Sequence, residues 1–167
     1  MSERAGERTE IRLGTRTEET VRIYFEKAQD PRIKAVLPQK AQSVEEALAD
    51  YRETLLPGAA SYGRTILADG VYVGDVWCYA IDPGDEPNAM LSFCLLDERL
   101  LGRGITTEAV GLFLREAGAK YALKTVGAFS FSDNAASIRV LEKNGFILCE
   151  EFVEAGRASK YFQRALG

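Results

Sequence analysis

Residues 101–109 read Leu-Gly-Arg-Gly-Ile-Thr-Thr-Glu-Ala, and they join a long apolar stretch to a helical pattern. Gly102 and Gly104 stand where the backbone turns, and glycine reaches conformations there that other residues avoid. The first N–H groups of a helix have no partner within that helix, and the helix dipole makes this end positive. The segment indicates a cradle for a pyrophosphate, with Arg103 as an added cation, although a tight turn alone explains two glycines equally well.

The segments on either side of this turn predict two strands joined by a helix. Residues 89–96 are apolar nearly throughout, which is typical of a strand buried on both faces. From Ile105 to Ala117, apolar residues line one side of a helix, for which Gly118 is the expected end. Residues 124–131 form the next strand. Because a helix separates the two strands, we expect them to be parallel and joined by a right-handed crossover.

The first half of the chain predicts two helices followed by an antiparallel meander. One helix begins near Thr17, behind a short edge strand at residues 11–13, and stops at Asp30-Pro31. The second helix follows Ser43, which starts a capping-box pattern completed by a glutamate three residues later. Asp69-Gly70 then lies between two alternating apolar runs, and this arrangement is a strong hairpin signal.

The last part of the chain predicts a short helix and a closing hairpin of residues 146–153 and 160–166. Asn134 is the expected N-cap of the helix, and Gly145 is suited to the left-handed position after its last turn. Together the elements predict a single domain over residues 1–167 of the α+β (mixed α/β) class. We expect a mixed, mostly antiparallel sheet of six to seven strands, flanked by about four helices. Residues 1–10 are expected to be flexible.

The composition excludes several classes of function. The chain has 167 residues, of which 46% are apolar and 28% charged, as in soluble globular domains. It contains no histidine, which removes His-activated nucleophiles, His bases and imidazole zinc sites, so no metal is expected. A net charge of −4 without a basic run argues against a nucleic-acid partner. No apolar segment predicts export or a membrane partner, so the expected location is the cytoplasm. We expect all three cysteines, Cys78, Cys94 and Cys149, to be buried.

Other nucleotide-binding motifs fit residues 101–109 poorly. A Walker loop ends in Gly-Lys-Ser/Thr, and a dinucleotide fingerprint needs a third glycine or alanine where this chain has Thr107. The segment instead resembles the acetyl-CoA loop of the GNAT acetyltransferases. It matches in particular the Gly-x-Gly-x-x-Thr-Glu-Ala form of the RimJ/RimL-like branch, the ribosomal-protein N-terminal acetyltransferases. It departs from the family pattern at Leu101, where Gln or Arg is usual, and at Thr106, where Gly or Ala is usual.

A second stretch, residues 134–146, is very similar to the Asn-x-x-Ser-x-x-x-x-Glu-Lys-x-Gly-Phe helix of the same family. Taken alone, it is also explained as a capped surface helix, with Asn134 as its N-cap and Ser137 as a tolerated polar residue. Its position one crossover after the glycine turn favours the family interpretation. With the two early helices included, the resemblance covers nearly the whole chain.

The resemblance implies a GNAT fold and an acetyl-CoA-dependent N-acetyltransferase that acts on a primary amine of a small molecule or a peptide. In the family, the parallel strands splay apart and the pantetheine arm of CoA pairs with the backbone of the earlier strand. Ser137 is the implied catalytic residue, as a hydrogen-bond donor to the departing sulfur. By analogy with relatives, the chain is also a candidate homodimer. The implied CoA-binding residues are Leu95, Leu96, Leu101, Gly102, Arg103, Gly104, Ile105, Thr106, Thr107 and Asn134.

The sequence leaves two alternatives and the identity of the base open. One alternative is a non-catalytic acyl-CoA sensor, since Leu101 departs from the motif and Leu141 stands in a helix where many relatives carry a tyrosine nearby. The other is an interaction module without a small ligand. The amine is not indicated, although residues 33–43 and the early helices are expected to select it. Without histidine, the base is a carboxylate or a relayed water. The candidate carboxylates are Asp75, Asp97, Glu98 and Glu108.

Overall fold

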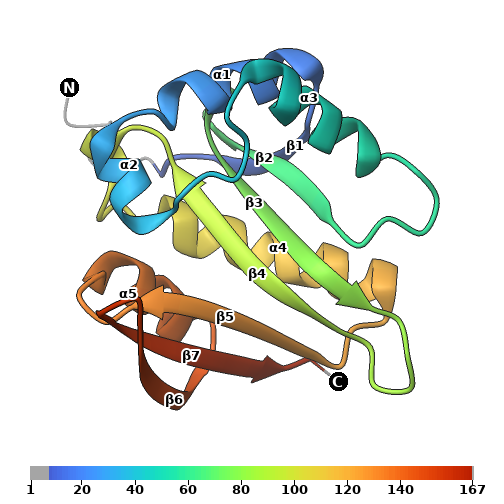
Figure 1. Cartoon of the computed structure of the whole chain (residues 1–167), viewed down its shortest axis with the longest axis vertical. Coiled ribbons are helices and arrows are strands. Elements are labelled where there is room, and N and C mark those ends of the chain that lie inside the picture. The colour runs from blue at the N-terminus through green and yellow to red at the C-terminus, as the bar shows by residue number, and fades with distance from the viewer. Residues whose placement is uncertain (1–7, 167) are drawn as a thin grey trace.

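Seven strands form one sheet within residues 8–166, the part of the chain that the computed structural model describes (Figure 1). Their order is β1-β2-β3-β4-β5-β7-β6, and every neighbouring pair is antiparallel except β4 and β5. This mixed sheet confirms the predicted fold class. The strands are β1 (Ile11–Thr15), β2 (Tyr62–Ala68), β3 (Val71–Asp82), β4 (Asn88–Leu95), β5 (Thr125–Phe131), β6 (Ile147–Glu154) and β7 (Arg157–Ala165).

Five α-helices accompany the sheet in the described residues, one more than the four expected. Three of them begin where capping residues predict. The side chains of Thr17, Ser43 and Asn134 each accept a hydrogen bond from a first-turn backbone N–H at 3.1 to 3.2 Å. Each bond satisfies a donor that the helix itself leaves unpaired. The helices are α1 (Glu18–Lys27), α2 (Pro31–Val36), α3 (Val44–Glu53), α4 (Ile105–Tyr121) and α5 (Ala135–Lys143).

The β2–β3 hairpin turns at Asp69 and Gly70, as predicted. Both residues have positive φ angles, 50° and 81°, and Ala68 pairs directly with Val71 across the turn. Two successive residues in this conformation give a turn whose twist matches that of the flanking strands. The turn therefore sets the register at the start of the β2–β3 pair, and this register shifts between Ile66 and Leu67.

Strands β4 and β5 separate soon after they meet. Their parallel pairing joins residues 88–90 to residues 125–127 and goes no further, although β4 continues to Leu95 and β5 to Phe131. The pairing is parallel, as predicted, and helix α4 connects the two strands. Beyond residue 90, the edge of β4 faces a gap instead of a neighbouring strand. This gap determines where a ligand can enter the sheet.

Each face of the sheet carries its own apolar core. Adjacent residues of a strand point to opposite faces, and Val76 and Trp77 of β3 mark the two sides. Val76 packs with the fully buried Phe113 of α4, in the larger cluster. Trp77 packs beside Ile33 and Cys94, in the cluster formed with α1 and α2. Helices α4 and α5 therefore cover one face of the sheet, and the first three helices cover the other.

The first helix ends before Asp30-Pro31 as predicted, but these two residues also begin α2, so there are three early helices instead of the two expected. Asp30 is the N-cap of α2, and its side chain accepts a hydrogen bond from the backbone N–H of Arg32 at 2.9 Å. Pro31 occupies the first helical position, where its missing N–H leaves no extra group unpaired. At six residues, α2 is too short for apolar periodicity to reveal. It nevertheless carries Arg32 and Leu37 to the candidate site.

Three further expectations need correction or fall outside the structure. Gly118 does not end α4, which runs to Tyr121 and is followed by Ala122 at a φ of 53°. Burial of the flanking apolar residues outweighs the cost of about 1 kcal/mol for a glycine inside a helix. Cys78 and Cys94 are buried as predicted, but Cys149 is exposed because β6 is an edge strand. Of residues 1–10, which are expected to be flexible, residues 1–7 lie outside the described residues.

Candidate active site

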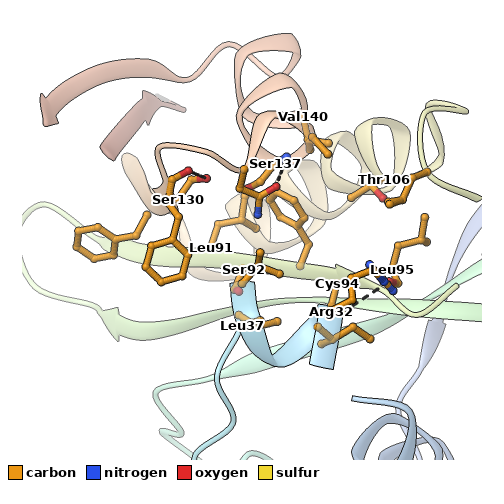
Figure 2. Close-up of a pocket in the computed structure, with 18 residues that line it drawn as sticks. Arg32, Leu37, Leu91, Ser92, Cys94, Leu95, Thr106, Ser130, Ser137 and Val140 are labelled. Carbon is orange, nitrogen blue, oxygen red and sulfur yellow. Dashed lines mark hydrogen bonds between the residues drawn. The ribbon is translucent and has the colours of Figure 1, made fainter. Parts of the chain in front are cut away.

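The gap between β4 and β5 opens into a cavity of about 260 Å³, which we call the gap cavity (Figure 2). Helix α2 borders it on one side of β4, and α5 and the start of α4 border it on the other. Segments distant in the sequence meet here because the two strands diverge. The predicted site residues that line the gap cavity are Leu95, Leu101, Thr106, Asn134 and Ser137.

The backbone of β4 presents hydrogen-bonding groups to this cavity. The N–H of Leu96 donates to the carbonyl of Val73 at 2.9 Å, so Leu96 directs its N–H toward β3. Successive residues of a strand point their backbone groups to opposite edges, so Phe93 and Leu95 direct theirs toward the gap. Of the two predicted backbone partners, Leu95 faces the gap cavity, and Leu96 has its N–H already engaged. The guanidinium of Arg32 lies within 3.4 Å of the carbonyl oxygen of Leu95.

The glycine turn has the conformation that an anion cradle requires. Gly102 and Gly104 have φ angles of 79° and 80°, and a Cβ atom added to either would meet no heavy atom within 4 Å. Gly104 is the N-cap of α4, and no side chain within residues 8–166 caps the helix there. The first amides of α4 at Ile105, Thr106 and Thr107 are therefore left for another acceptor.

A second, smaller cavity of about 100 Å³ surrounds this turn, and we call it the turn cavity. The two cavities adjoin, because both are lined by Leu95, Leu101, Thr106, Ala136 and Val140. The predicted residues Gly102, Gly104, Ile105, Thr106 and Thr107 all line it. An extended ligand entering the gap cavity therefore meets the start of α4 at its far end.

Arg139 and Lys143 supply the positive charge of the turn cavity. Both belong to α5, and the spacing of four residues places them on one face of that helix. The sequence did not indicate this role, because a lysine in the last turn of a helix is already explained by its favourable interaction with the helix dipole. Their spacing, combined with the predicted position of α5, was the available signal. Arg103 lines neither cavity, but it borders a hollow, with Arg8 and Glu108, that shares Gly104 and Ile105 with the turn cavity.

Helix α5 is held in position against α4 at the site. The side-chain amide of Asn144 donates to the carbonyl of Thr107 at 3.1 Å and to the carbonyl of Val140 at 3.0 Å. Asn134 caps the other end of α5 by accepting from the N–H of Ser137 at 3.2 Å. The hydroxyl of Ser137 makes no hydrogen bond to any residue among 8–166, and it lines the gap cavity. It is therefore free to donate to a ligand.

None of the four candidate carboxylates lines the gap cavity. Asp97 accepts hydrogen bonds from the side chain and backbone of Arg99, which lower its pKa to about 2. Glu98 is 68% exposed and lies 3.5 Å from Arg32. Asp75 is buried on the face of the sheet covered by the first three helices, and burial raises its pKa. Glu108 borders the hollow beside Arg103.

The described residues contain no group of three or more His, Cys, Asp or Glu side chains arranged to hold a metal ion. Among the helices of residues 8–166, none has both the length and the apolar composition that a membrane crossing needs.

Comparison with known proteins decides the family. The family model described as acetyltransferase (GNAT) domain matches residues 10–147. The chain belongs to the GNAT acetyltransferase family. This confirms the resemblance carried by the glycine turn and the α5 motif. None of the curated proteins compared matches this GNAT chain.

Solved structures share the GNAT fold at low sequence identity. RimL, a ribosomal L7/L12 α-N-protein acetyltransferase in complex with coenzyme A, is 21% identical, with a TM-score of 0.79 over 93% of this chain and 94% of that one. Spermidine N-acetyltransferase from Vibrio cholerae, in complex with CoA and spermine, is 13% identical, with a TM-score of 0.82 over 93% and 95%. The aminoglycoside acetyltransferase AAC(6')-Ib in complex with coenzyme A is 16% identical, with a TM-score of 0.76 over 93% and 95%. RimL represents the predicted RimJ/RimL-like branch.

Proposed function

We propose that this GNAT chain transfers an acetyl group from acetyl-CoA to a primary amine. One observation carries the proposal: the gap between β4 and β5 continues into the cavity at the uncapped start of α4. An extended ligand takes up backbone hydrogen bonds that a neighbouring strand leaves unused, and here the groups that face the gap are those of Phe93 and the N–H of Leu95, whose carbonyl already accepts from Arg32. The neighbouring structures that contain CoA or acetyl-CoA support the choice of ligand.

The turn cavity suits the diphosphate end of the same ligand. A pyrophosphate fits uncapped amides at a helix start, where the helix dipole also favours negative charge. The absence of Cβ atoms at Gly102 and Gly104 allows the backbone to approach the ligand closely. Arg139 and Lys143 add cations at this end. The predicted contribution of Arg103 stays part of the proposal, because its hollow adjoins the turn cavity at Gly104 and Ile105.

Acetyl-CoA supplies the acyl group: a C–N bond forms to the amine, the C–S bond breaks, and a proton leaves the nitrogen as the sulfur departs. Ser137 is proposed to donate a hydrogen bond to the departing sulfur from its unengaged hydroxyl. A backbone N–H on the β4 edge, at Phe93 or Leu95, is proposed to stabilise the developing negative charge on the carbonyl oxygen. Asn134 orients Ser137 by capping the first turn of α5.

The reaction needs a neutral amine, and the gap cavity offers no carboxylate from residues 8–166 to remove its proton. We therefore propose that the proton leaves through water and that the enzyme binds the neutral fraction of the amine. An α-amino group with a pKa of about 7.7–8.0 is partly neutral near pH 7, whereas a lysine side chain near 10.4 is not.

The deciding experiment combines calorimetric titration with acetyl-CoA and a thiol-release assay over a panel of amines. The proposal expects binding and the release of free CoA with at least one amine. Binding without turnover by any amine would instead support the acyl-CoA sensor. If acetyl-CoA neither binds nor raises thermal stability, the protein is an interaction module, because a ligand at 100 times its dissociation constant adds about 2.7 kcal/mol. Light scattering tests the proposed homodimer separately.

A further inference from the structure

A third cavity, of about 310 Å³, lies between α1, α3 and strand β3, and we call it the aromatic pocket. Apolar side chains such as Val21, Leu37 and Ala47 complete much of its wall. Small-molecule sites are typically cavities of this size, lined by apolar and aromatic residues with a few polar groups. The aromatic residues that line it are Tyr24, Phe25, Tyr51, Trp77 and Tyr79.

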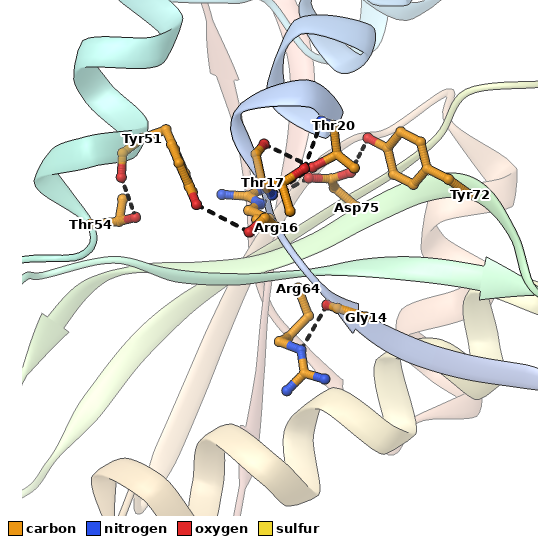
Figure 3. A network of polar contacts seen from close by, with 9 residues as sticks. All are labelled: Gly14, Arg16, Thr17, Thr20, Tyr51, Thr54, Arg64, Tyr72 and Asp75. Atoms are coloured by element: carbon orange, nitrogen blue, oxygen red, sulfur yellow. Dashed lines mark hydrogen bonds and ion pairs between the residues drawn. The ribbon is translucent and has the colours of Figure 1, made fainter.

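The charges inside the aromatic pocket neutralise each other. The Nε atom of Arg16 donates to Oδ2 of Asp75 at 2.8 Å, and the hydroxyl of Tyr72 donates to the other oxygen of the same carboxylate (Figure 3). The Arg16 guanidinium also lies 5.5 Å from the ring centroid of Trp77. The two opposite charges of this ion pair sum to zero, so the pair gives the pocket no net charge with which to attract a cation.

The remaining charged residues of the wall do not change this balance. Lys40 and Asp50 both line the pocket, and both are exposed. They carry opposite charges and stay hydrated at the surface, so together they add no net field at the opening. A polycation would need several unpaired carboxylates to replace the water that it loses. The aromatic pocket therefore suits an uncharged, apolar group.

The aromatic pocket meets the gap cavity at Leu37, which lines both. The two cavities are also neighbours across the β3–β4 pair. Trp77 lies directly opposite Ser92, and Asp75 lies opposite Cys94. Directly paired residues of antiparallel strands place their side chains on the same face of the sheet. Ser92 and Cys94 line the gap cavity, so a group bound beside Trp77 lies next to the gap.

We propose that the aromatic pocket binds the body of the acceptor, and that the acceptor is a small primary amine with one aromatic or branched apolar group and no second charge. This inference rests on the proposed acetyl transfer. The apolar body occupies the space among Tyr24, Trp77 and Tyr79, and the amine extends past Leu37 toward the gap cavity. Polyamines and aminoglycosides, which carry several ammonium groups, are poor acceptors for such a pocket.

The apolar wall of the gap cavity, which includes Leu37, Leu91 and Phe93, helps to supply a neutral amine. Removing an ammonium group from water disfavours its charged form, so an amine held against apolar walls loses its proton more readily than in solution. The gap cavity has no carboxylate among residues 8–166 to act as a base. The loss of water around the bound amine therefore replaces part of the work of a base in removing its proton.

The test compares 3-phenylpropylamine, propylamine, spermidine and kanamycin in the thiol-release assay. We expect kcat/KM for 3-phenylpropylamine to exceed that for propylamine at least about tenfold, because the ring is buried on binding. Spermidine and kanamycin are expected to be poorer than 3-phenylpropylamine. The single tryptophan of the chain, Trp77, lines the pocket, so its fluorescence reports amine binding whether or not transfer occurs.

Two matched variants locate the effect. Tyr79→Ser removes a ring from the aromatic pocket, and Tyr121→Ser removes a ring from the end of α4, away from the pocket. We expect Tyr79→Ser to lower the ratio of kcat/KM for 3-phenylpropylamine over propylamine about tenfold. Tyr121→Ser keeps the wild-type ratio. The ratio does not depend on the fraction of folded protein, so a loss of stability does not affect it.

The outcomes separate this inference from the proposed function. If no amine is acetylated but Trp77 fluorescence responds to 3-phenylpropylamine and not to spermidine, the pocket assignment stands and acetyl transfer fails. If spermidine or kanamycin is acetylated with the higher kcat/KM, acetyl transfer stands and the inference is overturned. An unchanged ratio in Tyr79→Ser also overturns it.

Discussion

Arg16, between β1 and α1, and Asp75, in the middle of β3, form an ion pair with 2.8 Å between Nε and Oδ2 (Figure 3). The side chain of Asp75 is 4% exposed and that of Arg16 is 19% exposed. Tyr51 of α3 donates to the backbone carbonyl of Arg16 at 3.1 Å. The pair therefore ties the entry to α1 and one turn of α3 to the central part of the sheet.

We predict that Asp75→Ala lowers the free energy of unfolding by about 3–5 kcal/mol, because it leaves the Arg16 guanidinium partly buried without its partner. Urea denaturation of the purified variant measures the change. Asp85→Ala, in an exposed loop, is the matched control and should stay within about 0.5 kcal/mol of the wild type. Replacing both partners, with Arg16→Met and Asp75→Leu, should restore part of the loss. A loss below about 1 kcal/mol in Asp75→Ala would show that the pair contributes little.

Gly104→Asp should abolish CoA binding by placing a carboxylate against the diphosphate. Gly104→Asn is the matched control, because Asn and Asp tolerate a φ of 80° similarly and a Cβ atom meets nothing within 4 Å there. Calorimetry should show a dissociation constant for acetyl-CoA at least about 100-fold higher in the Asp variant than in the Asn variant, since like charges in contact cost several kcal/mol. Equal affinities in the two variants would contradict the position of the diphosphate.

The elements with strong local signals were predictable from the sequence. Thr17, Ser43 and Asn134 cap their helices as expected, and Gly145 has a φ of 82° at the end of α5. Such signals act over a few residues, so they need no knowledge of the rest of the fold. The positive φ angles of Gly102 and Gly104 and the turn at Asp69-Gly70 were predictable for the same reason.

The features that depend on packing were not predictable in the same way. Helix α2 is too short to show a period, yet it brings Arg32 and Leu37 to the gap cavity. Arg139 and Lys143 gain a role only when α5 packs beside the start of α4. The ion pair of Arg16 and Asp75 joins residues 59 positions apart, so no local sequence pattern predicts it. Asp75 was consequently grouped with three other carboxylates as a candidate base.

Ser137→Ala should lower kcat for acetyl transfer by a factor on the order of 10², the low end of the range for a positioned proton donor. The KM for acetyl-CoA should change little, because the serine is proposed to act on the departing sulfur. Alanine is a good helix former and the Asn134 cap bonds only the backbone at this position, so the variant should fold normally. Ser132→Ala, outside the cavities, is the control. Loss of affinity without loss of kcat would assign Ser137 to binding alone.

The three cysteines should differ sharply in reactivity with a thiol reagent such as Ellman's reagent. Burial raises the pKa of Cys78 and of Cys94 to about 11, since the thiolate loses its hydration in the core. At pH 8, only about 10⁻³ of such a thiol is the reactive thiolate. Cys149 lies exposed on the edge strand β6.

We therefore expect one thiol per chain to react quickly at pH 8 in the native protein and all three to react in denaturant. The variant Cys149→Ser should show no fast-reacting thiol when folded and two when unfolded. Cys78 packs in the core between the sheet and α4, so its slow labelling measures how often that core opens. Cys94 packs on the opposite face of the sheet but also lines the gap cavity, so its labelling depends in addition on access through that cavity. Fast labelling of Cys94 at pH 8 would contradict the raised pKa of its thiol.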